Sequence, residues 1–177
     1  EAFVDWYIKE AKKEGCDVGI FTGDWHHNRS ALNLTTMDAS LRSLEKLGAA
    51  FDKFFFFPGN HDLYYKDKRE IHSVVFGKHV PGVTVVNEPM VIGDVALVPW
   101  LVGEEWKKVS KLKCKYMFGH FELPNFKMNA MVDMPDTGEI KADDFQSQEM
   151  VFSGHFHKRQ NNKNVWYIGN AFPHNYA

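Results

Sequence analysis

The spacing of apolar residues in the first third of the chain predicts helices that alternate with strands. Residues 1–14 carry apolar side chains every three or four positions, which is the period of one helix face. Residues 18–22 are apolar at consecutive positions, as in a parallel strand buried on both faces. The same two patterns return as a helix at 35–47, which Gly48 is expected to end, and a strand at 54–57. This alternation indicates an α/β fold with parallel strands.

The middle and the end of the chain carry shorter apolar runs. A short helix is predicted over residues 104–112, and Gly93-Asp94 is typical of a two-residue hairpin turn. Residues 125–144 have the least regular pattern, so we predict a long loop there, which in a compact domain is usually functional or mobile. Six further strands are predicted, at residues 83–86, 90–92, 95–98, 116–118, 150–152 and 165–168.

Composition and length predict one soluble domain. The chain has 177 residues, of which 44% are hydrophobic and 25% are charged, as in ordinary globular proteins. No apolar run approaches the roughly 20 residues of a membrane span, and no signal peptide is visible, so we expect no membrane partner. Cys16 and Cys114 lie in apolar sequence, which indicates reduced core thiols and a cytoplasmic protein. The net charge of −2 gives no basic signature for nucleic acid, although metal ions can neutralise phosphates where lysines do not.

The candidate chemistry lies where apolar runs stop. Four runs end in glycine followed at once by Asp, Asn or His: Gly23-Asp24, Gly59-Asn60-His61-Asp62, Gly119-His120 and Gly154-His155-Phe156-His157. Carboxylate, amide and imidazole donors suit Mn²⁺, Zn²⁺ or Fe rather than Ca²⁺ or a metal that prefers thiolates. The repetition therefore predicts one metal site built from the carboxyl ends of several strands. Two ions about 3.5–4 Å apart would clamp a phosphate and generate a hydroxide for in-line attack.

Residues in and next to these motifs are candidates for supporting roles in the same chemistry. His61 directly follows Asn60, so its ring would lie near the leaving oxygen and could act as a general acid. Asp62 is expected to brace the Asn-His loop through hydrogen bonds rather than to bind metal. Basic residues that follow the motif loops either form a solvated surface or contact the phosphate backbone of a nucleic acid. These residues are Lys66, Lys68, Arg69, Lys158, Arg159 and Lys163.

The order and context of the four motifs resemble the calcineurin-like metallophosphoesterases, and the resemblance spans nearly the whole chain. Residues 59–65 (GNHDLYY), Pro99-Trp100 and residues 119–123 are further similar to the SbcD-type nuclease subunit of the DNA double-strand-break repair complex, in its compact, phage-like version. The resemblance implies a two-sheet αββα sandwich and a dinuclear, metal-dependent phosphodiesterase. It implies a DNA exonuclease or endonuclease of repair or recombination, with DNA and an SbcC-type SMC-like ATPase subunit as partners, and it allows a homodimer.

The same resemblance implies a role for each motif residue. Two divalent ions are expected, Mn²⁺ first, with Mg²⁺, Zn²⁺ or Fe as alternatives. Asp24 would bridge both ions, and His61 would be the transition-state acid. Asn60, His120 and His155 would complete the second metal, and His157 would bind the first. His27 would lie near the substrate, and Lys158 and Arg159 are expected to contact it because of their position directly after the last motif.

One departure from the family concerns the beginning of the chain. The family starts with an Asp-x-His motif on a first strand that precedes the first helix, whereas this chain starts inside that helix. We therefore expect residues 1–177 to be a single metallophosphoesterase domain that lacks the first strand by truncation and has no C-terminal cap domain. A degenerate protein is the alternative. Three functions stay open: a DNA nuclease, a phosphoesterase of small molecules or phosphoproteins, and a non-catalytic binding or scaffold remnant.

Overall fold

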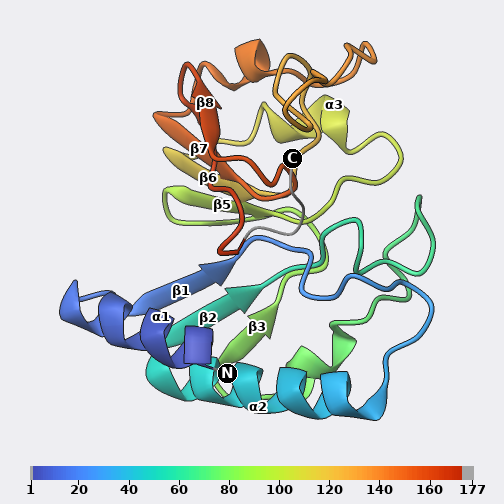
Figure 1. Cartoon of the computed structure of the whole chain (residues 1–177). Helices are drawn as coiled ribbons and strands as arrows, with labels where there is room; N and C mark the ends of the chain where they lie inside the picture. Colours follow the sequence, from blue (N-terminus) through green and yellow to red (C-terminus); the bar gives the residue numbers. More distant parts are fainter. Residues whose placement is uncertain (1, 173–177) are drawn as a thin grey trace.

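A computed structural model describes residues 2–172, which form two β-sheets packed face to face (Figure 1). The smaller sheet has the order β1-β2-β3, and its three strands are parallel. They are β1 (Val18–Phe21), β2 (Lys53–Phe56) and β3 (Val83–Val85). The larger sheet has the order β4-β5-β6-β7-β9-β8, in which the four inner strands are parallel and both edge strands are antiparallel to their neighbours. Its strands are β4 (Met90–Ile92), β5 (Val95–Val98), β6 (Tyr116–Gly119), β7 (Met150–Ser153), β8 (Gln160–Asn162) and β9 (Val165–Tyr167).

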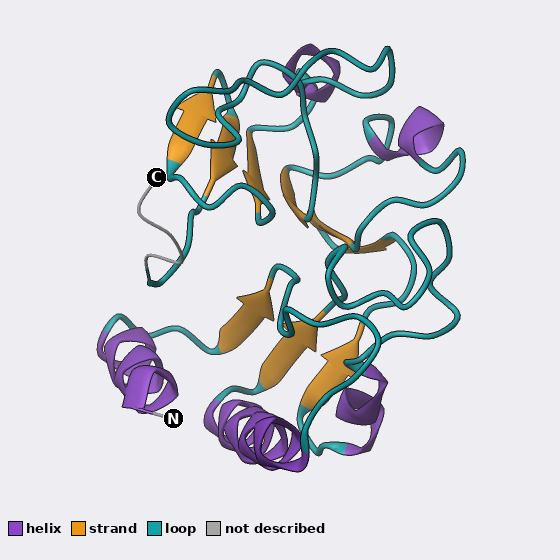
Figure 2. Ribbon diagram, turned by 45° about the vertical axis from the view of Figure 1, so that its right-hand side comes forward, coloured by secondary structure: helices purple, strands orange, loops and turns teal. Residues whose placement is uncertain are grey.

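Helices cover the outer face of the smaller sheet, and mostly loops cover the outer face of the larger one (Figure 2). The covering helices are α1 (Ala2–Lys13) and α2 (Leu34–Ala50), together with the 3-10 helix η1 (Val75–His79). On the opposite side lie α3 (Trp106–Val109) and the 3-10 helix η2 (Ala142–Phe145). The predicted two-sheet sandwich is therefore confirmed, with an outer layer on the larger sheet that contains little helix.

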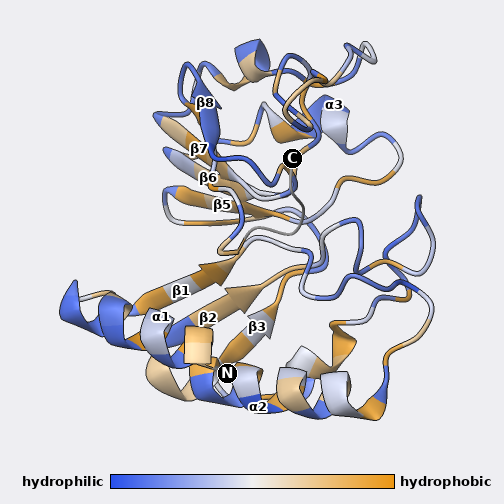
Figure 3. Ribbon diagram, in the orientation of Figure 1, coloured by the Kyte–Doolittle hydropathy of each residue, from blue (hydrophilic) through white to orange (hydrophobic). Residues whose placement is uncertain are grey.

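The run of phenylalanines in and after β2 contributes to two hydrophobic cores, one under the helices and one between the two sheets. Side chains alternate between the faces of a strand. Phe54 and Phe56 accordingly pack against the helices, whereas Phe55 and Phe57 pack between the two sheets with Leu97. All five side chains are at most 8% exposed. Strand β2 consequently colours mostly as hydrophobic in Figure 3, and each buried ring stabilises the sandwich by about 1.5–3 kcal/mol.

Several predicted elements differ from the observed ones. Helix α2 continues to Ala50, so Gly48 does not end it. A Cβ atom at Gly48 would lie 2.3 Å from the carbonyl oxygen of Pro81, so close packing explains this glycine. Helix α3 has only four residues, and strand β8 was not predicted because its residues Gln-Asn-Asn lack any apolar alternation. The Cys16 thiol is exposed rather than in the core, and Cys114 is half-buried.

The segment predicted as a long loop is partly ordered. Residues 125–134 fold back on themselves, with backbone hydrogen bonds from Asn125 to Met134 and from Met128 to Val132. An ion pair between Lys127 and Asp133 closes the same turn. The helix predicted for residues 1–14 is observed as α1, and Glu1 lies outside the described residues. No helix within residues 2–172 is both long enough and apolar enough to cross a membrane.

Candidate metal centre

Parallel pairing in each sheet brings the four glycine-containing loops together. Phe21 of β1 pairs with Phe56 of β2, so the loops that carry Asp24 and Asn60 leave the smaller sheet at the same edge. Gly119 of β6 pairs in the same way with Ser153 of β7. Loops that leave the carboxyl ends of parallel strands form the usual binding crevice of open α/β sheets. Here the two sheets contribute two such loops each, and the loops meet between the sheets.

The glycines before the polar residues are required by this close approach. A Cβ atom at Gly23 would lie 2.5 Å from His120 Nδ1, and one at Gly59 would lie 2.3 Å from Asp24 Oδ1. A Cβ atom at Gly154 would lie 2.6 Å from the carbonyl oxygen of Thr22. Each distance is shorter than real Cβ contacts allow. The glycine prefixes in the sequence thus mark where one site loop packs against another.

We expect Gly59→Ala to reduce the affinity of the protein for Mn²⁺. The new methyl group would displace the carboxylate of Asp24 and also approach His120 Cε1 at 2.6 Å. Misplaced ligands and supporting groups typically reduce metal affinity by about 10–100-fold. Isothermal titration with Mn²⁺ measures the effect, and Gly138→Ala is the control: its φ of 79° also strains an alanine, but its new methyl group would meet no atom within 4 Å. Unchanged affinity in Gly59→Ala would contradict the prediction.

Four candidate ligand residues converge in the crevice. Ligand atoms of Asp24, His120 and His155 all lie within 4.8 Å of one another. Asn60 Oδ1 lies 3.0 Å from His120 Nε2 and 3.0 Å from His155 Nδ1. Asp24 Oδ2 lies 3.3 Å from His120 Nε2. Two ligand atoms bound at right angles to an ion at about 2.1 Å are about 3 Å apart, so these separations fit a shared cation.

The hydrogen-bond partners of the two imidazoles also favour a cation. His120 Nδ1 lies 2.7 Å from the carbonyl oxygen of Thr22, an acceptor, so Nδ1 carries the proton and Nε2 keeps its lone pair. His155 Nε2 lies 3.2 Å from Glu122 Oε1, which leaves the lone pair on Nδ1. Both lone pairs then face the oxygen of Asn60. Acceptors that face one another repel unless a proton or a cation lies between them, and this donor set suits a transition metal.

The expected protonation states match those a metal requires. Burial alone would raise the pKa of Asp24, but the hydrogen bond and the positive charge that the His120 ring supplies when it is protonated lower that pKa to about 2. Burial lowers the pKa of His155, and the hydrogen bond that its ring donates to Glu122 acts in the opposite direction. Near neutral pH the centre therefore offers an ionised carboxylate and a neutral imidazole, which are the forms that bind metal.

Two of the candidate ligands have strained backbones. Asp24 has a φ of 61° and His155 a φ of 84°, in the left-handed region that favours glycine. Only two other described non-glycine residues, Asn125 and Lys163, have positive φ. Such strain costs about 1–3 kcal/mol and persists where the surroundings hold it, often at functional sites. The coincidence of strain with the two ligands supports a functional role for this crevice.

Asp62 holds the loops of the smaller sheet in place. Its carboxylate is fully buried and accepts hydrogen bonds from the backbone N–H groups of Asp24, Trp25, His26 and Gly59, at 2.8–3.2 Å. Burial raises the pKa of this carboxyl, and the N–H donors act in the opposite direction. The predicted bracing by hydrogen bonds is confirmed, and it extends to the loop of Asp24.

His26 has Asp-x-His spacing from Asp24 but serves another purpose. Its ring is 3% exposed, and its two nitrogens lie 2.8 Å from the hydroxyl oxygens of Ser73 and Ser40. With both nitrogens occupied, the ring ties the Asp24 loop to α2. Burial lowers the pKa of His26 to about 4, so the ring is neutral at physiological pH.

His61 lies at the rim of the centre, next to His27. Its backbone N–H donates to Asp24 Oδ1 at 2.8 Å, and its Nδ1 donates to the carbonyl oxygen of His27 at 3.1 Å. The two imidazole rings stack at 5.0 Å. Because Nδ1 is engaged, Nε2 is the nitrogen of His61 that can exchange a proton with a substrate.

The remaining predicted residues lie outside the group of three titratable ligands. His157 is exposed, as are Lys158 and Arg159. Their predicted roles stay predictions. Arg69, for which we left a solvated surface and a phosphate contact open, instead pairs with Glu105, and its side chain is only 8% exposed. Neither reading fits Arg69, because its guanidinium group is already bound within the protein.

Glu122 is the residue that the sequence patterns did not reveal. Its carboxylate accepts the Nε2–H of His155 and thereby fixes the tautomer of a candidate ligand. The hydrogen bond from His155 lowers the pKa of Glu122, so the carboxylate is ionised. A carboxylate behind a metal-binding histidine is a common supporting arrangement. The position of Glu122 two residues after His120 is the only signal for it in the sequence.

Comparison with known proteins agrees with this geometry. The family model of the calcineurin-like phosphoesterases matches residues 1–159. A relative, exonuclease subunit 1 of Enterobacteria phage T4, is 29% identical over 171 residues, which cover 92% of this chain and 50% of that protein. The chain thus spans about half the length of this relative.

Proposed function

Since the chain belongs to the calcineurin-like phosphoesterase family, we propose that it is a metal-dependent phosphodiesterase that cleaves DNA. The family and the exonuclease relative support a hydrolase that acts on phosphoester bonds. The observation that carries the proposal is the convergence of Asp24, Asn60, His120 and His155, whose lone pairs face one another. DNA is the proposed substrate because the relative is named as an exonuclease subunit.

In this proposal the chain holds two ions through the motif residues. Asn60, His120 and His155 would hold one ion together with Asp24, and Asp24 and His157 would hold the other. Mn²⁺ is the proposed metal, with Mg²⁺, Zn²⁺ and Fe as alternatives. Bound cations at this place would supply positive charge to the phosphate oxygens and lower the pKa of the attacking water.

His61 supplies the proton for the leaving oxygen. The carbonyl oxygen of His27 holds Nδ1–H and so orients the ring, which leaves Nε2 to carry the transferred proton. A protonated imidazole near a leaving alkoxide is a general acid suited to neutral pH. His27 stacks on the same ring, which restricts its rotation and supports a role in positioning substrate.

Hydrolysis assays with defined substrates test the proposal. The protein is incubated with Mn²⁺ and labelled single- and double-stranded DNA, or with a generic aryl phosphodiester, and Asn60→Ala is the inactive control. Metal-dependent cleavage of DNA that is faster than hydrolysis of the aryl diester supports the nuclease. Hydrolysis of the aryl diester alone favours a small-molecule phosphoesterase. Metal binding without hydrolysis of either substrate favours a non-catalytic scaffold.

We expect exposed basic residues to hold the DNA backbone beside the centre. Replacing Lys66, Lys68, Lys158 and Arg159 by Gln should weaken DNA binding about equally for all sequences. It should also reduce the slope of log K against log salt by up to about one unit per lost phosphate contact. Fluorescence anisotropy at several salt concentrations measures both effects.

A matched variant controls for net charge. Lys9, Lys12, Lys13 and Lys53 lie on α1 and at the start of β2, at the far end of that strand from the centre. Neutralising these four should leave the salt slope unchanged, and neither variant should alter hydrolysis of the aryl diester. Equal losses on DNA and on the aryl diester would indicate damage at the metal centre instead.

The name of the phage relative also suggests a subunit of a larger assembly. We propose that the chain works with an SbcC-type SMC-like ATPase in DNA repair or recombination. Co-expression followed by size-exclusion chromatography tests this, and separate elution of the two proteins would contradict it. A homodimer and a cytoplasmic location stay predictions.

A further inference from the structure

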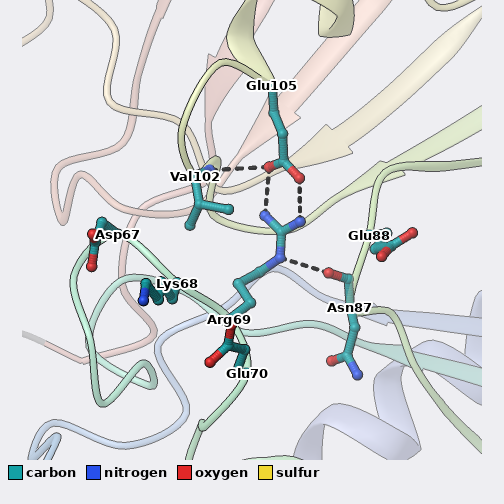
Figure 4. A pocket seen from close by; sticks show the side chains of 8 residues that line it. All are labelled: Asp67, Lys68, Arg69, Glu70, Asn87, Glu88, Val102 and Glu105. Atoms are coloured by element: carbon teal, nitrogen blue, oxygen red, sulfur yellow. Dashed lines mark hydrogen bonds and ion pairs between the residues drawn. The ribbon is translucent and has the colours of Figure 1, made fainter.

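Arg69 and Glu105 form a half-buried ion pair beside a polar pocket of about 390 Å³ (Figure 4). The guanidinium group donates two parallel hydrogen bonds to the carboxylate, and the nitrogen and oxygen atoms of one of them are 2.6 Å apart. The side chain of Arg69 is 8% exposed and that of Glu105 is 29% exposed. Burial alone would raise the pKa of Glu105, but the bonds from Arg69 and from the Val102 N–H lower it, so the pair is ionised.

The same guanidinium group binds two backbone carbonyls from different segments. Arg69 Nε donates to the carbonyl oxygen of Asn87 at 2.6 Å, and its NH1 group donates to that of Trp100 at 2.6 Å. Figure 4 shows the Asn87 bond and the fork that faces Glu105. Arg69 therefore joins the segment after the His61 loop to the segments that precede β4 and follow β5. An exposed lysine with a single point charge could not make this set of bonds.

Trp100 connects this ion pair to the candidate ligands. Its backbone N–H donates to the carbonyl oxygen of Pro58, two residues before Asn60, at 3.0 Å. Its ring lies 5.9 Å from the ring of His120 and 5.3 Å from that of His155. The two histidine rings lie 5.2 Å from each other. The backbone of Trp100 is thus held through its N–H by Pro58 and through its carbonyl oxygen by Arg69. Its indole ring packs against both imidazoles.

We propose that Arg69 and Glu105 are positioning residues for the metal centre and act through Trp100. This inference rests on the proposed function, because it needs His120 and His155 to bind a metal. Aromatic packing restricts the rotation of the two imidazoles, and the ion pair restricts the rotation and translation of Trp100. Residues that support metal ligands typically alter metal affinity by about 10–100-fold when they are replaced.

Metal affinity in a folded protein is the measurement that tests the inference. Isothermal titration with Mn²⁺ is performed on the wild type, Arg69→Lys, Arg69→Met/Glu105→Met and Trp100→Phe. The double variant removes both charges, so no buried charge is left unpaired. We expect Kd to rise about tenfold or more for Arg69→Lys and the double variant, and less for Trp100→Phe, which keeps an aromatic ring. Thermal unfolding in chelator establishes that each variant is folded under the titration conditions.

A surface ion pair supplies the matched control. Lys163 and Asp143 pair at 2.6 Å with both side chains more than half exposed, so Lys163→Met/Asp143→Met should leave Kd unchanged. Wild-type affinity in the folded Arg69→Met/Glu105→Met variant would overturn the inference and leave the proposed function intact. A wild-type protein that binds no Mn²⁺ would overturn the proposed function, and this inference with it.

Discussion

His61→Ala should retain metal binding and lose about 10²–10⁴-fold in the rate of DNA cleavage. The ring of His61 contributes no candidate ligand atom to the centre, so Mn²⁺ affinity should remain at the wild-type value. The leaving oxygen of a DNA strand is a poor leaving group and needs a proton. Single-turnover cleavage of labelled DNA with saturating Mn²⁺ measures the loss, and calorimetry measures the retained affinity.

Two comparisons separate this effect from general damage. An aryl phosphodiester with a good leaving group needs no proton, so its hydrolysis should fall far less than that of DNA. His79→Ala removes an exposed imidazole from η1 and should cleave DNA at the wild-type rate. Wild-type cleavage of DNA by His61→Ala would remove this residue from the mechanism.

Asp62→Asn should destabilise the metal-free protein by about 3–5 kcal/mol. The buried carboxylate accepts four backbone N–H groups and also lies 3.3 Å from the hydroxyl oxygen of Ser73. An amide has one oxygen instead of two, and its NH₂ group would face N–H donors. Urea unfolding in chelator, followed by circular dichroism, gives the free energy of unfolding.

The same substitution at an exposed position is the control for Asp62. Asp52→Asn changes an exposed aspartate at the start of β2 by the same atoms and should alter the free energy of unfolding by less than about 0.5 kcal/mol. The predicted loss is a large share of the roughly 5–15 kcal/mol that stabilises a typical domain. A difference below about 1 kcal/mol between Asp62→Asn and the wild type would show that the carboxylate does not organise the loops.

Local sequence patterns predicted an α/β fold and the place of the candidate centre, whereas the two-sheet sandwich was predicted from the family resemblance. Apolar runs located most strands, because a strand that is buried on both faces is apolar at consecutive positions. Glycine followed by Asp, Asn or His located the loops, because parallel strands end at one edge of a sheet. Asp24, Asn60, His120 and His155, far apart in the sequence, lie together in the structure. Their role as ligands stays a proposal.

Apart from the bracing by Asp62, the supporting contacts could not be predicted, because they join residues with no common period. Arg69 and Glu105 are 36 residues apart, and His155 and Glu122 are 33 apart. Charge alone suggested a phosphate contact for Arg69, since a sequence does not tell whether a guanidinium group already has a carboxylate partner. His26 similarly has the spacing of a ligand, and only the positions of Ser40 and Ser73 reveal its role.

The left-handed backbones of Asp24 and His155 imply a trade-off between the stability of the fold and the binding of metal. Glycine at either position would relieve strain of about 1 kcal/mol or more, yet it would delete a candidate ligand. Selection of random variants for heat resistance alone should therefore enrich replacements at these two positions. Laboratory evolution of a more heat-resistant form of this protein would therefore need to select for metal retention in every round.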